Sequence, residues 1–155
     1  MRINMLRVLV LCCIVAAFAG CRTMKPLPPA DLKEPGWTVR EGQAVWKRKA
    51  DAPEIAGEIL VATRTDGRAF VQFSKNPFPM VIAQSTSKGW QVETPTENKF
   101  YSGHGQPPAR LIFLYIPRLL AGQPAPKGWT YQKLGDGYKL ENHASGESLE
   151  VYFTQ

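Results

Sequence analysis

Two alternating segments on either side of a short turn constrain the fold most. Ile55 to Thr65 and Arg68 to Ser74 both read as extended chain and are joined by Asp66-Gly67, a pair whose turn matches the twist of antiparallel strands. Alternate residues of a strand point to opposite faces, so Phe70 and Phe73 face opposite ways. The sequence predicts a β-hairpin with apolar side chains on both faces.

The rest of the chain beyond Trp37 repeats this pattern of short apolar runs ended by turn residues. We expect about eight strands in one antiparallel sheet that curls on itself, a mostly β (α+β) fold. The other expected strands are Thr38 to Lys49, Pro79 to Thr86, Trp90 to Glu93, Lys99 to Ser102, Trp129 to Leu134, Tyr138 to His143 and Ser148 to Phe153.

One segment departs from the strand pattern. RLIFLYIPRLLAG, residues 110 to 122, is the most apolar stretch after Trp37, and Pro117 fits neither a helix interior nor a central strand. We expect an apolar segment up to Ile116 and then a short helix, with Pro117 in its first turn and Gly122 at its end. This helix would cover the open side of the sheet. A buried edge strand followed by a loop is the alternative.

The N-terminus reads as a secretory signal peptide over residues 1 to 20. Arg2 and Arg7 precede an apolar run from Val8 to Ala19, which is short for a membrane span of about 20 residues. Phe18-Ala19-Gly20-Cys21 resembles the bacterial lipobox, in which the cysteine becomes the mature N-terminus and is acylated. The alternatives are an ordinary thiol after an ordinary signal peptide, or a retained membrane helix.

The lipobox resemblance implies an envelope protein held by a lipid anchor. Diacylglyceryl and N-acyl groups on Cys21 would be the only non-protein groups, and two or three acyl chains make a durable anchor. Arg22 follows the cysteine, where an Asp would favour inner-membrane retention in enterobacteria. We therefore expect the protein at the outer membrane, with its domain in the periplasm.

Cysteine content and composition divide the chain after Cys21 into a tether and a folded domain. Cys12 and Cys13 leave with the signal peptide and Cys21 is acylated, so we expect no disulfide and no metal site in the domain. RTMKPLPPADLKEPG, residues 22 to 36, is proline-rich and predicts an extended tether. Residues 37 to 155 would form the folded domain, near the membrane and monomeric.

The charge balance is mild. The formal net charge is +6, and removal of Arg2 and Arg7 lowers it to +4. The basic residues are dispersed, and the cluster Lys47-Arg48-Lys49 is typical of a solvated strand end. We expect no nucleic-acid partner, although a basic face could lie near anionic lipid.

The order of these features resembles the lipoprotein-localisation (LolA/LolB-like) family. Four stretches carry the resemblance: GEILVATRTDGRAFVQF, the NPFP loop, GWQVE and IPRLLAGQPAP. The resemblance implies an incomplete β-barrel with one or two short capping helices that binds the acyl chains of lipoproteins. The lipid anchor matches the receptor branch of that family, so lipoproteins or a periplasmic lipoprotein carrier are the partners implied.

The receptor branch has a protruding loop between its third and fourth strands with an exposed apolar residue. The matching loop is SKNPFP, Ser74 to Pro79, with Phe78 between Pro77 and Pro79. Two prolines stiffen such a tip and reduce the entropy lost when Phe78 inserts into lipid or a partner. The alternative is that Phe78 folds back onto the end of the barrel.

An acyl-binding half-barrel needs a concave face lined by large apolar side chains without charge. The same side chains would serve equally as a filled core, so both interpretations stay open. The candidates are Trp46, Leu60, Phe70, Phe73, Trp90, Leu111 and Phe113, the last two in the run to Leu114.

Catalytic residues are poorly supported. His104 lies near Ser102 in the stretch Tyr101 to Gly105, but no nucleophile motif surrounds them and Glu97 is the nearest acid in sequence. Asp66 and Asp136 precede glycines and fit turns better than catalysis. We expect no enzyme. The sequence favours an outer-membrane-anchored acceptor of acyl chains or lipoproteins; the alternative is a lipid-tethered interaction or structural module with a filled core.

Overall fold

The computed structural model of the chain describes residues 25–154. It contains nine strands, one for each of the ranges predicted from the sequence, together with one short α-helix and two 3₁₀ turns. The strands are β1 (Trp37–Lys47), β2 (Glu54–Arg64), β3 (Ala69–Lys75), β4 (Phe78–Ser85), β5 (Trp90–Thr94), β6 (Lys99–Gly103), β7 (Trp129–Leu134), β8 (Gly137–Asn142) and β9 (Glu147–Phe153). The helical elements are η1 (Pro95–Glu97), η2 (Ile112–Tyr115) and α2 (Ile116–Leu120).

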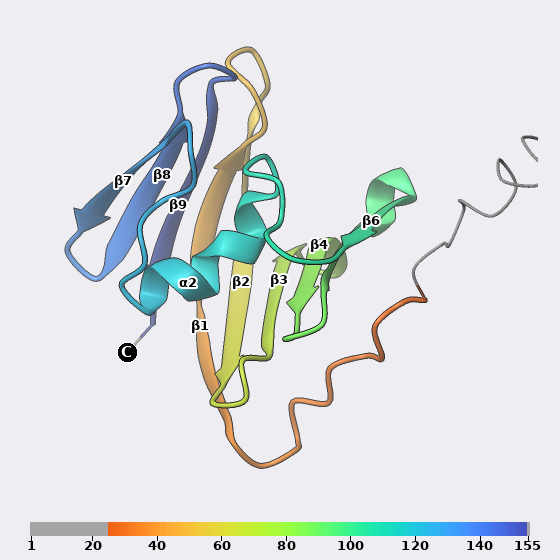
Figure 1. Cartoon of the computed structure of the whole chain (residues 1–155). Coiled ribbons are helices and arrows are strands. Elements are labelled where there is room, and N and C mark those ends of the chain that lie inside the picture. Colours follow the sequence, from red (N-terminus) through yellow and green to blue (C-terminus); the bar gives the residue numbers. More distant parts are fainter. Residues whose placement is uncertain (1–24, 155) are drawn as a thin grey trace, which may run out of the picture.

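All nine strands belong to one antiparallel sheet, as the sequence predicts. Their order in space is β6-β5-β4-β3-β2-β1-β9-β8-β7. The C-terminal meander therefore joins the sheet through pairing of β9 with β1. The sheet stays open, because β6 and β7 form its two edges and do not pair with each other within the described residues (Figure 1).

Strand alternation gives the sheet one fully buried face, which we call the inner face. Val71 and Phe73 of β3 lie across from Val61 and Ile59 of β2, and all are buried. Across β1 the same face continues through Ala44 to β9 and β8. The residues of this face that are less than 2% exposed include Ala44, Ile59, Val61, Val71, Phe73, Ala83, Leu140, Leu149 and Val151.

A short helical segment covers the inner face, and we call η2 and α2 together the cap. α2 contacts β2 and β3, while η2 contacts β4; Figure 1 shows α2 crossing in front of the strands. Pro117 lies in the first turn of α2, and Gly122 follows the helix with φ +79°, which glycine adopts without steric cost. The expected short helix is thus present, and the edge-strand alternative is wrong because residues 112–115 form a 3₁₀ turn.

The proline-rich segment before β1 has no strand or helix over residues 25–31, yet it is bonded to the sheet. Leu27 N–H donates to Gln91 Oε1 of β5 at 2.7 Å. Glu34 accepts hydrogen bonds from Arg64 and Arg68. Figure 1 shows this segment turning from the start of β1 towards the β4–β6 side. Between Leu27 and Glu34 the segment is therefore attached to the domain and is not a free tether.

Residues 1 to 24, which include the expected signal peptide and Cys21, lie outside the described part of the chain. Between residues 25 and 154, no helix has both the length and the apolar character that crossing a membrane requires.

Candidate functional site

Three aromatic rings from distant parts of the chain meet on the inner face. Trp46 of β1 packs edge-on against Phe73 of β3 and Phe113 of η2, with ring centroids 6.0 and 5.1 Å apart. Phe73 and Phe113 are 5.9 Å apart. Trp90 belongs to the same buried cluster, and Leu111 packs against it partly buried. Five of the seven candidate lining residues therefore come together.

Leu60 and Phe70 do not join them. Ile59 and Val61 point to the inner face, so Leu60 between them points to the outer face, and Phe70 does the same before Val71. Leu60 lines a shallow hollow of about 320 Å³ on the outer face, among polar side chains that include Glu41 and Glu58. Placing these two residues in an apolar cavity is thus wrong, because strand alternation puts them on the other side of the sheet.

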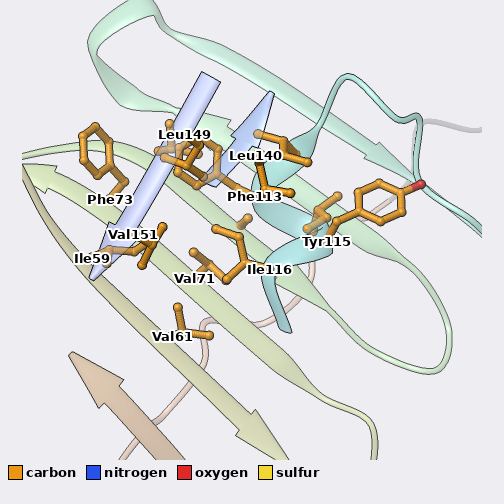
Figure 2. Packing of buried hydrophobic residues seen from close by; sticks show 14 of the residues in the cluster. Ile59, Val61, Val71, Phe73, Phe113, Tyr115, Ile116, Leu140, Leu149 and Val151 are labelled. Carbon is orange, nitrogen blue, oxygen red and sulfur yellow. The ribbon is translucent and has the colours of Figure 1, made fainter. Parts of the chain in front are cut away.

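The inner face is filled by side chains of the cap. Ile116 is fully buried, and Phe113 and Leu114 are each 3% exposed. Figure 2 shows Phe113 and Ile116 pointing at Phe73, Val71 and Leu149, whereas the Tyr115 ring points away from them. An acyl chain could occupy this face only if the cap moved.

No hydrogen bond holds the cap against the sheet within the described residues. The hydrogen bonds of residues 107–123 that the structure describes stay within that segment, as in Tyr115 Oη to the Pro107 carbonyl at 2.5 Å. One polar contact reaches the sheet, where the Arg110 guanidinium lies 5.4 Å from the Tyr101 ring. Dispersion and the hydrophobic effect are not directional, so the packing of the cap on the sheet rests mainly on contacts without a fixed direction.

A polar pocket of about 190 Å³ adjoins the apolar interior through Trp46. Trp46 Nε1 donates to Glu147 Oε1 at 3.1 Å, and the Arg48 guanidinium lies 4.8 Å from the Trp46 ring. Glu97 forms ion pairs with Arg48 and with Lys99. Sequence reasoning missed this pocket, because Glu147 is 101 residues from Trp46 and no motif connects them.

Burial raises the pKa of Glu147, and the hydrogen bond from Trp46 and the charge of Arg48 offset only part of that effect. Folded Glu147 therefore keeps its proton above the unfolded value of 4.5. The contribution of this group to stability falls as the pH rises from that value through the raised folded pKa.

We expect Glu147→Gln to be at least as stable as the wild type at pH 7. Glutamine keeps a carbonyl acceptor for Trp46 and cannot ionise, so the fall in stability above pH 4.5 should become shallower. Urea unfolding of both proteins at several pH values measures this. Glu147→Ala is the control, because it leaves the Trp46 donor unpaired and should lose about 1 kcal/mol. A comparable loss for Glu147→Gln at pH 7 would show that the ionised carboxylate stabilises the pocket.

The predicted protruding loop is a tighter turn than expected. β3 extends to Lys75 and β4 begins at Phe78, so only Asn76 and Pro77 lie between the strands. Phe78 pairs with Lys75 and is 65% exposed, the highest value among the exposed large apolar residues between positions 25 and 154. The alternative in which Phe78 folds back onto the domain is therefore wrong.

Neither histidine lines the polar pocket. His104 Nδ1 is 2.7 Å from the Lys88 carbonyl in the β4–β5 turn. His143 lies at the end of β8, near Thr130 and Glu141. In the described part of the chain, no three His, Cys, Asp or Glu side chains are grouped so that they could hold a metal ion.

No protein-family model matches the chain, and no curated protein matches it either.

Proposed function

We propose that this protein is an envelope lipoprotein, anchored in the outer membrane through acylated Cys21, that accepts the acyl chains of other lipoproteins and delivers them to the bilayer at the Phe78 turn. The proposal takes its anchor from the lipobox-like sequence before Cys21. Its partners would be acylated proteins, received directly or from a periplasmic carrier. The sheet and cap would work as the incomplete barrel that the family resemblance implies.

The exposure of Phe78 is the observation that carries this proposal. A phenylalanine that is 65% exposed gains about 1.5–3 kcal/mol when it is fully buried in an apolar environment. Pro77 precedes it and Pro79 follows it, and the short β3–β4 turn holds it at the end of the sheet. A stiff tip loses little conformational entropy on insertion, so this residue is suited to enter lipid.

The way the cap is held supports acyl binding. The cap fills the inner face with aliphatic and aromatic side chains and has no hydrogen bond to the sheet within the described residues. An incoming acyl chain would make contacts of the same kind as Phe113 and Ile116 do. Displacement of the cap therefore exchanges one set of apolar contacts for another and breaks no directional bond to the sheet.

We expect Phe78→Glu to abolish delivery of an acylated lipoprotein to vesicles while leaving the thermal midpoint of unfolding nearly unchanged. A charged side chain disfavours entry into lipid, whereas exposed substitutions usually alter stability by less than about 0.5 kcal/mol. Tyr152→Glu is the matched control, since Tyr152 is also an exposed aromatic residue at 44%, but it lies in β9. Equal loss of delivery in both variants would contradict a specific role for Phe78.

A second function is favoured by the filled inner face, where Phe73 and Ile116 are completely buried. In that case the protein is a lipid-tethered interaction module with a permanent core and binds an envelope partner through its surface. A fluorescent fatty-acid probe distinguishes the two functions. Saturable binding by the mature chain carrying Cys21→Ser supports acyl acceptance, and no binding at any probe concentration supports the interaction module.

A further inference from the structure

The polar pocket beside Trp46 lies where distant strands of the curled sheet approach each other. One side of it is formed by Trp46 of β1, by Arg48 just after that strand and by Glu147 of β9. The other side comes from the chain between β5 and β6 and consists of Thr94, Glu97, Lys99 and Tyr101. β1 and β6 are five places apart in the sheet order. The ion pair between Arg48 and Glu97 therefore joins two parts of the sheet that do not pair with each other.

Trp46 belongs both to this pocket and to the apolar interior. Its ring meets Phe73 and Phe113 edge-on. Its Nε1 donates to Glu147, and the Arg48 guanidinium lies over the ring, 4.8 Å from its centre. The polar lining thus begins at the ring where the buried apolar cluster ends. A surface of this kind matches an amphiphile, whose polar head is joined to the end of an apolar chain.

The Arg48 guanidinium has hydrogen-bonding capacity that the protein does not use. Its Nη1 donates to Glu97, whereas its Nε is buried and has no partner between residues 25 and 154. A guanidinium carries several N–H donors in a fixed fork, and a buried donor without an acceptor costs free energy. An oxygen atom of a ligand in the pocket would give this side chain a second acceptor.

The charges that line the pocket balance, and this balance selects the kind of head that fits. Glu97 forms ion pairs with both Arg48 and Lys99, and Glu147 supplies a second carboxylate. Burial raises the pKa of Glu147, so the balance is complete in mildly alkaline buffer, where this carboxyl is ionised. A carboxylate on the ligand would add a charge without a counterion, which is costly in a partly buried site. A neutral carbonyl oxygen accepts a hydrogen bond from Arg48 and adds no charge.

The pocket lies at the same end of the sheet as the Phe78 turn. Neighbouring strands from β1 to β5 are antiparallel, so β1, β3 and β5 run in the same direction. Arg48 follows β1, the turn at Asn76-Pro77 follows β3, and Thr94 ends β5. The head of an amphiphile bound in the pocket would therefore lie at the end from which the proposed function delivers acyl chains.

We propose that this pocket binds the neutral ester or amide carbonyl at the head of an acyl chain, with Arg48 as the hydrogen-bond donor, while the chain occupies the inner face beside Trp46. The inference rests on the proposed function and adds the chemical group that is recognised. Acyl chains attached to proteins and those of phospholipids share this carbonyl. Free fatty acids carry a carboxylate and fit the balanced pocket less well.

The test uses the acylated protein, purified from membranes and held in nanodiscs of ether-linked phospholipid, which has no ester carbonyl. Two photoreactive fatty acid methyl esters are added in mildly alkaline buffer, one with a diazirine beside the carbonyl and one with a diazirine at the chain end. Mass spectrometry should place the first probe on Trp46, Arg48 or Tyr101 and the second on Phe73 or Phe113. The free acid of the first probe should label the pocket severalfold less than the ester does.

Competition identifies the source of the carbonyl. Loss of pocket labelling when a diacylated lipopeptide is added assigns the carbonyl to acylated proteins and supports both proposals. Loss of labelling with diacyl phosphatidylethanolamine alone assigns it to phospholipid, which supports the inference and contradicts the acceptance of lipoproteins.

Variants test the role of each charge. Arg48→Met should reduce pocket labelling severalfold, because it removes the donor and keeps an unbranched side chain. Arg40→Met is the matched control, since Arg40 also lies over an aromatic ring, 5.9 Å from the centre of Phe153, but near the other end of β1. Glu147→Gln removes one negative charge and should shift the preference towards the free acid. Glu150→Gln makes the same change on the opposite face of β9 and should not.

Equal pocket labelling in Arg48→Met and Arg40→Met overturns the inference. So does an unchanged preference for the ester in Glu147→Gln, and this comparison decides alone if Arg48→Met does not fold. Labelling by the chain-end probe at Phe73 or Phe113 would leave the proposed acyl binding standing in either case. Absence of that labelling in every protein contradicts the proposed function, and the inference falls with it.

Discussion

Phe73→Ala is expected to lower the free energy of unfolding by about 3–5 kcal/mol. Phe73 is the largest fully buried side chain of the domain, and its ring contacts both Trp46 and Phe113. Its removal would leave a cavity where β3, β1 and the cap meet. Because surrounding side chains close such cavities only partly, the lost contacts add to the lost hydrophobic transfer energy. Urea unfolding followed by tryptophan fluorescence measures the difference.

Phe78→Ala supplies the control within the same hairpin. It deletes the same atoms, but Phe78 is 65% exposed, so the change in stability should stay within about 0.5 kcal/mol. Similar losses for the two variants would mean that Phe78 is buried in solution or that the inner face is loosely packed. Loose packing would in turn favour a cavity over a core.

The hairpin and the cap could be predicted because their signals are local. Asp66-Gly67 fixes the turn between β2 and β3, and Pro117 and Gly122 fix the two ends of the short helix. These residues restrict their own backbone angles whatever surrounds them. Alternation of apolar and polar residues is also a local signal, and it predicts most strands of the sheet.

The face that each strand buries was harder to predict. Ile59 and Leu60 are adjacent aliphatic residues, and only the folded sheet shows that Ile59 faces the cap while Leu60 faces outwards. When a strand has apolar residues on both faces, its sequence does not show which face is buried. Phe70 was misplaced for the same reason.

Contacts between distant segments were not predictable from one sequence. Arg48 meets Glu97 across 49 residues, and Leu27 meets Gln91 across 64. Neither pair has a sequence pattern. Arg48 follows β1 and Glu97 precedes β6, five strands away in the sheet order, so the two meet only because the sheet curls. The prediction of a free tether for residues 22 to 36 rested on composition alone. A free segment and a docked segment can have the same content of prolines and charged residues, so composition does not distinguish them.

Cys21→Ser is expected to move the protein from the membrane fraction to the soluble periplasmic fraction. One acyl chain binds a bilayer with a constant of only about 10⁴ M⁻¹, and a second chain makes the attachment durable at about 0.8 kcal/mol per buried methylene. A serine at this position accepts no thioether-linked lipid, so both contributions disappear together. The Phe78 turn would remain, but it offers one aromatic side chain, too little to hold the domain on the membrane alone.

The matched control is Cys12→Ser, which also replaces a cysteine but lies in the segment that the signal peptidase would remove. It should leave the membrane fraction and the mature mass unchanged, whereas Cys21→Ser should lose the mass of the acyl groups. Retention of Cys21→Ser in the membrane would mean that another segment attaches the protein.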